Sequence, residues 1–151
     1  MDVDVITPMF KDYLAYMCRF YTISDYDAWC EGALKKLRRF SHENDRYIYV
    51  IEKSGVVVGF TVVNNHVRFN RDGLAIAEFY IQKDHEKKGY GRMLAEFVFA
   101  RFPGSWEVAI ATKNTSARQF WEQVVSSYTH GQFIEKRTAP FDGSGFLFNN
   151  A

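Results

Sequence analysis

The residues best suited to chemistry lie between Glu78 and Leu94, in the segment EFYIQKDHEKKGYGRML. A strand-like run ends there, a basic loop follows, and Gly89 and Gly91 open a helix. Backbone N–H groups in the first turn of a helix lack partners within it and lie at the positive end of its dipole. Glycine lets the main chain approach an anion without a Cβ in the way. Three cationic side chains surround this point, namely Lys87, Lys88 and Arg92. The segment therefore predicts a phosphate or pyrophosphate site.

The spacing excludes two well-known phosphate loops. The chain has no GxxxxGK followed by Ser or Thr, which argues against a P-loop nucleotide-binding site. The dinucleotide pattern GxGxxG fails because Leu94 stands three residues after Gly91. On their own, the two glycines also fit a tight turn between a strand and a helix, with the lysines at a solvated rim.

Apolar spacing predicts the elements that must position this segment. Spacings of three and four residues predict helices near 10–18, 25–37, 93–98 and 117–125. β-Branched and aromatic runs predict strands at 47–51, 56–63, 74–81, 106–111, 132–137 and 145–149. The alternation that begins at strand 74–81 is typical of a parallel β-α-β unit with a right-handed crossover. We therefore expect a mixed-sheet α/β fold.

Composition is that of an ordinary globular domain. The 151 residues, 47% hydrophobic and 25% charged, predict one domain over 1–151. A net charge of +1 argues against a nucleic-acid partner. No apolar stretch approaches the ~18 residues of a membrane span, and the N-terminus is acidic, so we expect a cytoplasmic protein with no membrane partner. Cys18 and Cys30 have no metal-ligand spacing, so we expect no metal.

The run from Glu78 to Trp121 resembles the GNAT superfamily of acyl-CoA-dependent N-acetyltransferases. One family motif is Gln or Arg, two residues, Gly, one residue, and Gly or Ala; here the loop reads Glu86-Lys87-Lys88-Gly89-Tyr90-Gly91. The second, NxxAxxxY, is matched from Asn114 except at its last position. The resemblance implies a GNAT-like α/β fold with a mixed, mostly antiparallel central sheet of six to seven strands. A parallel β-α-β centre and about four helices complete it.

The resemblance also implies a reaction. An acetyl group would pass from acetyl-CoA to a primary amine by direct attack in a ternary complex. The acceptor would be a small-molecule amine or a protein amine, and no metal would take part. Many relatives dimerise, so a homodimer is one option that the resemblance brings with it.

Residues that would bind the co-substrate follow from the two motifs. The main chain of Phe79, Tyr80 and Ile81 would pair with the pantetheine arm, because relatives splay two parallel strands here. The amides of six loop residues would hold the pyrophosphate, namely Lys87, Lys88, Gly89, Tyr90, Gly91 and Arg92. Asn114, with Ala117 in the same motif, would reach the pantetheine; Asn is equally suited to be the N-cap of that helix.

Two candidates for proton transfer emerge. An ammonium has no lone pair, so a base must accept a proton, and Glu78 just before the co-substrate segment is the best candidate. The alternative is that Glu78 faces solvent or pairs with a basic neighbour. Trp121 stands where many relatives have a tyrosine acid, and an indole cannot serve as one. Tyr128 would then protonate the thiolate, with Tyr80 or water as alternatives.

Other side chains are candidates for contact with the acceptor. Acceptor recognition is expected from the first two helices and the loop Asn64–Gly73. Acidic candidates for a cationic acceptor, which also fit a solvated helix surface, are Asp12, Asp25, Asp27 and Glu31. Candidates for an aromatic pocket wall are Tyr13, Tyr16, Trp29 and Tyr47. The histidines are expected at the surface, namely His42, His66, His85 and His130.

Two alternative functions stay open. Glu86, a negative charge where relatives have Gln or Arg, and Trp121 motivate a catalytically idle acyl-CoA-binding or regulatory module on the same fold. The basic loop Lys83–Arg92 motivates an anion- or nucleic-acid-binding module, against which the near-zero net charge weighs.

Overall fold

The computed structural model describes residues 3–40, 46–137 and 141–151, which contain four α-helices and six strands. The helices are α1 (Thr7–Met17), α2 (Tyr26–Phe40), α3 (Tyr90–Arg101) and α4 (Thr115–Thr129). The strands are β1 (Arg46–Lys53), β2 (Val56–Asn64), β3 (Leu74–Ile81), β4 (Ser105–Ala111), β5 (Ile134–Arg137) and β6 (Gly143–Asn149). Short 3₁₀ turns are η1 (Val3–Val5), η2 (Cys18–Phe20) and η3 (Lys83–His85).

The six strands form one sheet in the order β1-β2-β3-β4-β6-β5. Every pair is antiparallel except β3–β4, which α3 connects. This confirms the expected mixed α/β fold with a parallel β-α-β centre. The hairpin of β1 and β2 falls where the sequence predicts it, whereas β5 begins two residues later and β6 two residues earlier than expected.

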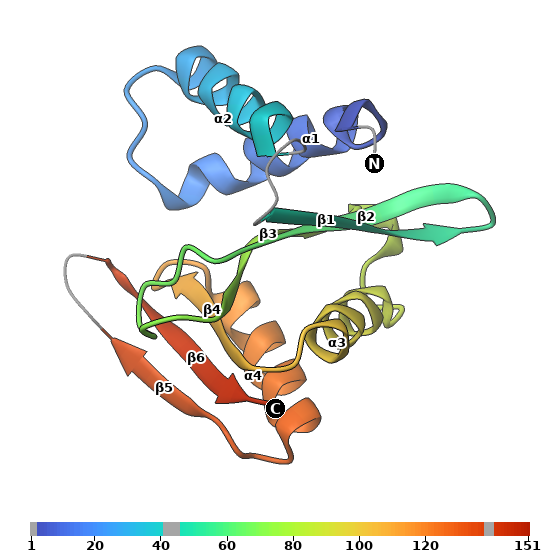
Figure 1. Ribbon diagram of the computed structural model, residues 1–151. Coiled ribbons are helices and arrows are strands. Elements are labelled where there is room, and N and C mark those ends of the chain that lie inside the picture. The colour runs from blue at the N-terminus through green and yellow to red at the C-terminus, as the bar shows by residue number, and fades with distance from the viewer. Residues whose placement is uncertain (1–2, 41–45, 138–140) are drawn as a thin grey trace.

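The helices cover both faces of the sheet (Figure 1). One face packs on α1 and α2, where buried residues such as Phe10 and Leu37 meet Phe60 of β2. The opposite face packs on α3 and α4, around Phe99 and Trp106. Most of the aromatic side chains of the protein lie in these two cores, as expected for side chains that bury large apolar areas. Within the described ranges, no helix is both long and apolar enough to cross a membrane.

A buried carboxylate shapes the connection between β2 and β3. Glu107 of β4 is 1% exposed and accepts hydrogen bonds from the main-chain N–H groups of Arg68, Phe69 and Asn70, at 2.6, 3.2 and 2.9 Å. A buried charge needs this degree of hydrogen bonding to be tolerated. The ring of Phe69 also lies against Gly145 of β6. Loop 65–73 is therefore fixed over β4 and β6, beside the area that α1 and α2 cover (Figure 1).

Candidate active site

The parallel strands β3 and β4 pair only at their first residues. Leu74 pairs with Trp106 and Ala75 with Glu107, and no later residue of β3 has a partner on β4. The other edge of β3 remains paired with β2 up to Ile81. From 76 onward one edge of β3 has no partner among the described strands, and this is where the sequence resemblance places two splayed strands. Such an edge offers main-chain groups that can pair with an extended ligand.

At the end of β3 the chain forms a loop whose amides point to no acceptor. The first hydrogen bond of α3 runs from the N–H of Met93 to the carbonyl of Gly89, at 3.0 Å. Among the described residues, none accepts a hydrogen bond from the main-chain N–H groups of Lys87 to Arg92. Lys87 and Gly89 both have positive φ, 60° and 87°. Left-handed residues beside a helix start form a concavity of N–H groups that suits an anion.

The two glycines of the loop act differently. Gly89 is exposed, with no atom within 4 Å of the position that a Cβ would take, so it supplies positive φ and close access from outside. Gly91 is buried, and a Cβ there would lie 2.9 Å from the ring of Phe120. The open space at Gly89 fits the prediction of close access for an anion, whereas Gly91 has no such space. Gly91 instead lets the first turn of α3 approach α4.

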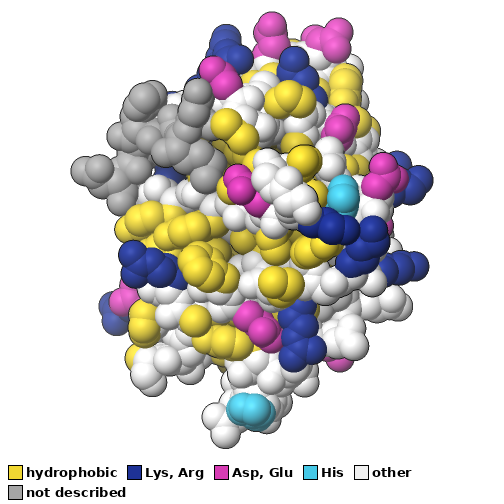
Figure 2. Space-filling model, turned by 90° about the vertical axis from the view of Figure 1, so that its right-hand side faces the viewer, with side chains coloured by type: hydrophobic (Ala, Val, Ile, Leu, Met, Phe, Trp, Pro, Cys, Tyr) yellow, Lys and Arg dark blue, Asp and Glu magenta, His cyan; other side chains and the backbone are white. Residues whose placement is uncertain are grey.

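Positive charge gathers where the loop 82–89 enters α3. Figure 2 shows Lys and Arg side chains clustered around a histidine on this part of the surface. Lys87 and Lys88 are exposed there. The guanidinium of Arg92 instead contacts Glu96 of α3 at 2.9 Å and Ser127 of α4 at 2.7 Å. Arg92 thus brings its amide to the loop, while its side-chain charge is engaged elsewhere.

The three residues expected to line the co-substrate segment lie at the open end of β3. Phe79 faces α4, with ring centroids 5.6 Å from Phe120 and 4.7 Å from Trp121. Tyr80 faces α1, and burial and then the charge of a neighbouring acid, Asp12, raise its pKa. Ile81 adjoins Gly91. The strand therefore leads directly from its unpaired edge to the loop of free amides.

A β-bulge in β3 turns Glu78 towards α1. Two adjacent residues of β2 pair with Glu78 and Ile76, so Ala77 is an extra residue on β3. Side chains alternate between faces along a regular strand, which would put Ile76 and Glu78 on the same face. Instead, Ile76 packs in the core with α3 and α4, whereas Glu78 meets Tyr13 of α1. The bulge thus decides which side of the sheet receives the carboxylate.

Glu78 has the electrostatic properties of a base that works near neutral pH. Removal from water raises its pKa to about 7, while the hydrogen bond from Tyr13 and the charge of Lys36 act in the opposite direction. The hydroxyl of Tyr13 donates to Oε2 of Glu78. Thr61 donates to the main-chain carbonyl of Glu78 at 2.7 Å. Glu78 is half-buried, and its hydrogen-bond partner is a phenol, whereas the basic neighbour Lys36 acts through its charge.

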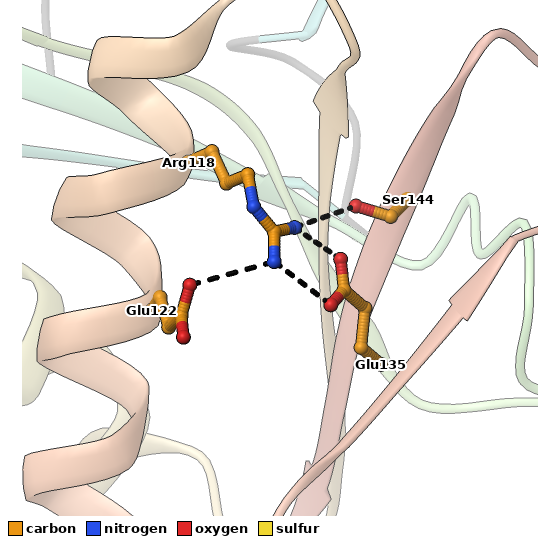
Figure 3. A network of polar contacts seen from close by, with 4 residues as sticks. All are labelled: Arg118, Glu122, Glu135 and Ser144. Carbon is orange, nitrogen blue, oxygen red and sulfur yellow. Dashed lines mark hydrogen bonds and ion pairs between the residues drawn. The ribbon is translucent and has the colours of Figure 1, made fainter.

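Asn114 caps α4. Its side-chain oxygen accepts from the N–H of Ala117 at 3.2 Å, and Asn114 is 6% exposed. Figure 3 shows Arg118, one turn into the helix, paired through both terminal nitrogens with Glu135 of β5. The same guanidinium reaches Ser144 of β6 at 3.4 Å. These contacts fix the start of α4 to the hairpin of β5 and β6, and the N-cap interpretation of Asn114 is confirmed.

Trp121 and Tyr128 lie at different places along α4. Trp121 is buried between Phe79 and Phe99. Tyr128 stands seven residues further on, about 10 Å along the helix axis at 1.5 Å per residue. Its hydroxyl accepts from Asn150 at 3.0 Å and its ring packs on Phe99. Tyr128 thus lies about two turns beyond Trp121, with its hydroxyl beside Asn150.

The acceptor candidates lie apart from one another. Tyr13 is buried beside Glu78, and Tyr16 packs on Phe20. Trp29 contacts Tyr21, and Tyr47 packs on Phe102 across the sheet. The four expected wall residues therefore do not form one pocket. Of the acidic candidates, Asp25 accepts from the N–H of Ala28 at 3.1 Å as a helix cap, and all four are exposed.

A hollow lies beside the segment that follows η2. It has a volume of about 350 Å³ and is lined by residues 21–25 and Trp29. Burial, and next the charge of Glu78, raise the pKa of Tyr21, while Arg68 of loop 65–73 lowers it. Tyr21 therefore lies within electrostatic reach of both Glu78 and Arg68. One residue of the hollow's lining, Tyr21, is thus linked electrostatically to the carboxylate and to loop 65–73.

Two of the described histidines are exposed, as expected. His66 is exposed and contacts Arg46 at 3.0 Å, and His130 is exposed at the end of α4. His85 is partly buried, and no described group bonds its Nδ1. His42 lies outside the described residues.

Sequence reasoning missed three features of this site. The role of Tyr13 as a donor to Glu78 and that of Glu107 as an acceptor for loop 65–73 depend on tertiary contacts. The bulge at Ala77 depends on register with β2. An acid inside an otherwise apolar strand, as at Glu107, was the one available signal.

Comparisons with known proteins agree with this architecture. A profile of the acetyltransferase (GNAT) family matches residues 9–125. The fold is similar to an acetyltransferase from Thermus thermophilus, with a TM-score of 0.72 and 14% identity over 98% of this chain and 90% of that one. It is also similar to the PaiA N-acetyltransferase from Thermoplasma acidophilum in complex with coenzyme A, with a TM-score of 0.66 and 12% identity over 99% and 95% of the two chains. No curated protein sequence matches the chain.

Proposed function

Because this chain belongs to the acetyltransferase (GNAT) family, we propose that it transfers the acetyl group of acetyl-CoA to a primary amine. The observation that carries the proposal is the meeting of three features at the open end of β3. These are an unpaired strand edge, a loop of free amides and a carboxylate whose pKa is about 7. The edge suits a pantetheine arm, the loop suits a diphosphate, and the carboxylate suits an amine.

The loop from Lys87 to Arg92 would hold the diphosphate through its main chain. Six N–H donors without partners among the described residues, at the start of α3, offer hydrogen bonds and the positive end of the helix dipole. The exposed ammonium groups of Lys87 and Lys88 add charge that offsets Glu86. The main chain of Phe79, Tyr80 and Ile81 would pair with the pantetheine arm, and Asn114 would face it from α4 while it caps the helix.

Glu78 would act as the general base. A carboxyl group with a pKa near 7 is half deprotonated at neutral pH. It therefore binds a proton strongly enough to act as a base, and enough of it is in the deprotonated form that can accept one. It would take one proton from the ammonium form of the acceptor, directly or through a water molecule. The amine nitrogen then attacks the thioester carbonyl, a C–N bond forms and the C–S bond breaks.

The remaining protons need no dedicated acid. The nitrogen loses a second proton as the amide forms, and the departing thiolate gains one. Trp121 cannot supply it, and the hydroxyl of Tyr128 is already engaged with Asn150. A thiolate is a tolerable leaving group, so water can protonate it, with Tyr80 as the nearest phenol on β3. Main-chain N–H groups on the open edge of β3 would stabilise charge on the carbonyl oxygen, and the juxtaposition of the two substrates supplies much of the acceleration.

The acceptor, a small-molecule amine or a protein amine, would enter between the segment after η2 and loop 65–73. Tyr21 and Arg68 flank this approach to Glu78, next to the hollow lined by Trp29. A second candidate function, a catalytically idle acyl-CoA-binding module, draws support from Trp121 in place of the usual tyrosine.

A screen of amine acceptors with detection of released thiol tests the proposal. We expect repeated turnover of acetyl-CoA with at least one class of amine, and a loss of about two orders of magnitude or more in Glu78→Gln, the usual size of a general-base contribution. Binding of acetyl-CoA without turnover on any amine would favour the idle module. Equal rates in the parent and Glu78→Gln would contradict the role of Glu78.

A further inference from the structure

We propose that Tyr13 is a positioning residue that fixes one oxygen of Glu78 so that the other faces the acceptor. The inference rests on the proposed function, in which Glu78 accepts a proton from the amine. The hydroxyl of Tyr13 donates to Oε2. No described residue donates to Oε1, which leaves that oxygen free to accept from an amine or a water molecule. The two oxygens of one carboxylate thus have separate tasks.

The ring of Tyr13 is held rigidly. It is 5% exposed, and its centroid lies 5.7 Å from each of the rings of Phe10, Phe60 and Tyr80. A ring packed on three sides cannot turn without displacing its neighbours, because protein cores are close-packed. The phenol oxygen is therefore fixed, and so is the carboxylate that it contacts. Such preorganisation keeps the base in one orientation before the acceptor arrives.

Few other charged groups face Glu78. Lys36 approaches from α2, and Tyr21 from the segment after η2, with Arg68 of loop 65–73 beside Tyr21. Tyr80, two residues along β3, contacts the ring of Tyr13. On the α3 and α4 side, the described neighbours of this part of β3 are apolar rings such as Phe120. Among the described groups that affect the pKa of Glu78, Tyr13 is thus the one that donates a hydrogen bond to its carboxylate.

The phenol keeps its proton throughout the range in which Glu78 titrates. Burial, and next the charge of Glu78, raise the pKa of Tyr13 well above its ordinary value. A protonated donor favours the ionised carboxylate, so the contact lowers the pKa of Glu78. Removal of the hydroxyl should raise it. The acidic limb of kcat/KM, which reports the base of the free enzyme, should then move to higher pH.

The test compares Tyr13→Phe with Tyr16→Phe, which removes a phenol from the same helix. Tyr16 packs on Phe20 and Arg19. In Tyr13→Phe we expect the acidic limb to rise by roughly one pH unit or more, the size expected for loss of a hydrogen bond to a charged group. The affinity for acetyl-CoA should be unchanged. In Tyr16→Phe the limb should stay where it is in the parent.

A second readout makes the result independent of turnover. The titration of the Glu78 carboxyl is followed by NMR in protein labelled with ¹³C-glutamate, and assigned with Glu78→Gln. A ring-fluorinated tyrosine at position 13 keeps the packing and is a stronger donor, so it should lower the pKa of Glu78 where Tyr13→Phe raises it. An unmoved titration in both Tyr13 variants would overturn the inference. A moved titration with transfer that does not depend on Glu78 would overturn the proposed function instead.

Discussion

Gly91 and Phe120 pack so closely that a Cβ on Gly91 would lie 2.9 Å from one ring carbon of Phe120 and 3.0 Å from another. The same ring lies 5.6 Å from that of Phe79 on β3. The first turn of α3, the start of α4 and the open end of β3 therefore meet at one aromatic side chain. The position of the amide loop depends on this contact.

The first prediction concerns this contact. Gly91→Ala must displace either α3 or the ring of Phe120, which is partly buried and packs against the core. Overpacking of this kind costs about 1–3 kcal/mol, and the displaced loop should bind acetyl-CoA more weakly. Thermal unfolding and calorimetry measure the two effects. Adding Phe120→Leu to Gly91→Ala should restore part of the stability and part of the affinity for acetyl-CoA. If Gly91→Ala alone had the stability and affinity of the parent, the packing argument would be contradicted.

The second prediction separates strain from binding. Gly89 and Gly55 both have positive φ, 87° and 81°, and neither has an atom within 4 Å of an added Cβ. Either substitution by alanine should cost about 1 kcal/mol of stability from left-handed strain. Only Gly89→Ala should weaken the binding of acetyl-CoA, because Gly55 lies in the turn between β1 and β2. Equal affinities in the two variants, measured by calorimetry, would argue against the loop as the diphosphate site.

The third prediction concerns Glu107. Glu107→Ala leaves the amides of 68–70 without their acceptor inside the protein, which should cost roughly 3 kcal/mol or more. Glu135→Ala, the matched control, removes a partly exposed ion pair with Arg118 and should cost under about 1 kcal/mol. Denaturant unfolding gives both values, and hydrogen exchange should show lost protection at 68–70 in Glu107→Ala alone. Unchanged exchange there would refute the anchoring role of Glu107.

The fourth prediction concerns pH and stability. The folded pKa of Glu78, about 7, exceeds the ordinary value of 4.5. The folded state therefore binds more protons between these values, and the contribution of Glu78 to stability declines as pH rises from 4.5 to about 7. Relative to the parent, Glu78→Gln should gain on the order of 3 kcal/mol over this range. Denaturant unfolding at several pH values measures the difference, and a difference independent of pH would disagree with a buried, neutralised carboxyl.

Much of the fold could be predicted from local patterns. The hairpin of β1 and β2, the β-α-β centre and the cap at Asn114 all follow from signals within a few residues. The amide loop was predictable too, because Gly89 and the start of α3 are adjacent in the chain. Such elements satisfy their own backbone hydrogen bonds, so neighbouring residues determine them.

The features of the site that could not be predicted from the sequence depend on contacts between segments far apart in the chain. Tyr13 and Glu78 are 65 residues apart, and only the packing of α1 on the sheet brings them together. The bulge at Ala77 shifts register by one residue, which changes the face that every later side chain occupies. Tyr128 was a candidate by residue type, and its contacts with Phe99 and Asn150 depend on packing that residue type does not reveal. The periodicity of apolar residues indicates which face of a helix or strand is buried, but not which other elements pack against that face.

The proposed function depends above all on the main-chain amides from Lys87 to Arg92, which would hold the diphosphate of acetyl-CoA. Titration of ¹⁵N-labelled protein with acetyl-CoA, followed through the backbone amide resonances, is the decisive experiment. We expect saturable shifts that are largest at these six amides and extend along 79–81. Resonances of the six amides that stay unchanged up to millimolar acetyl-CoA would contradict the proposal.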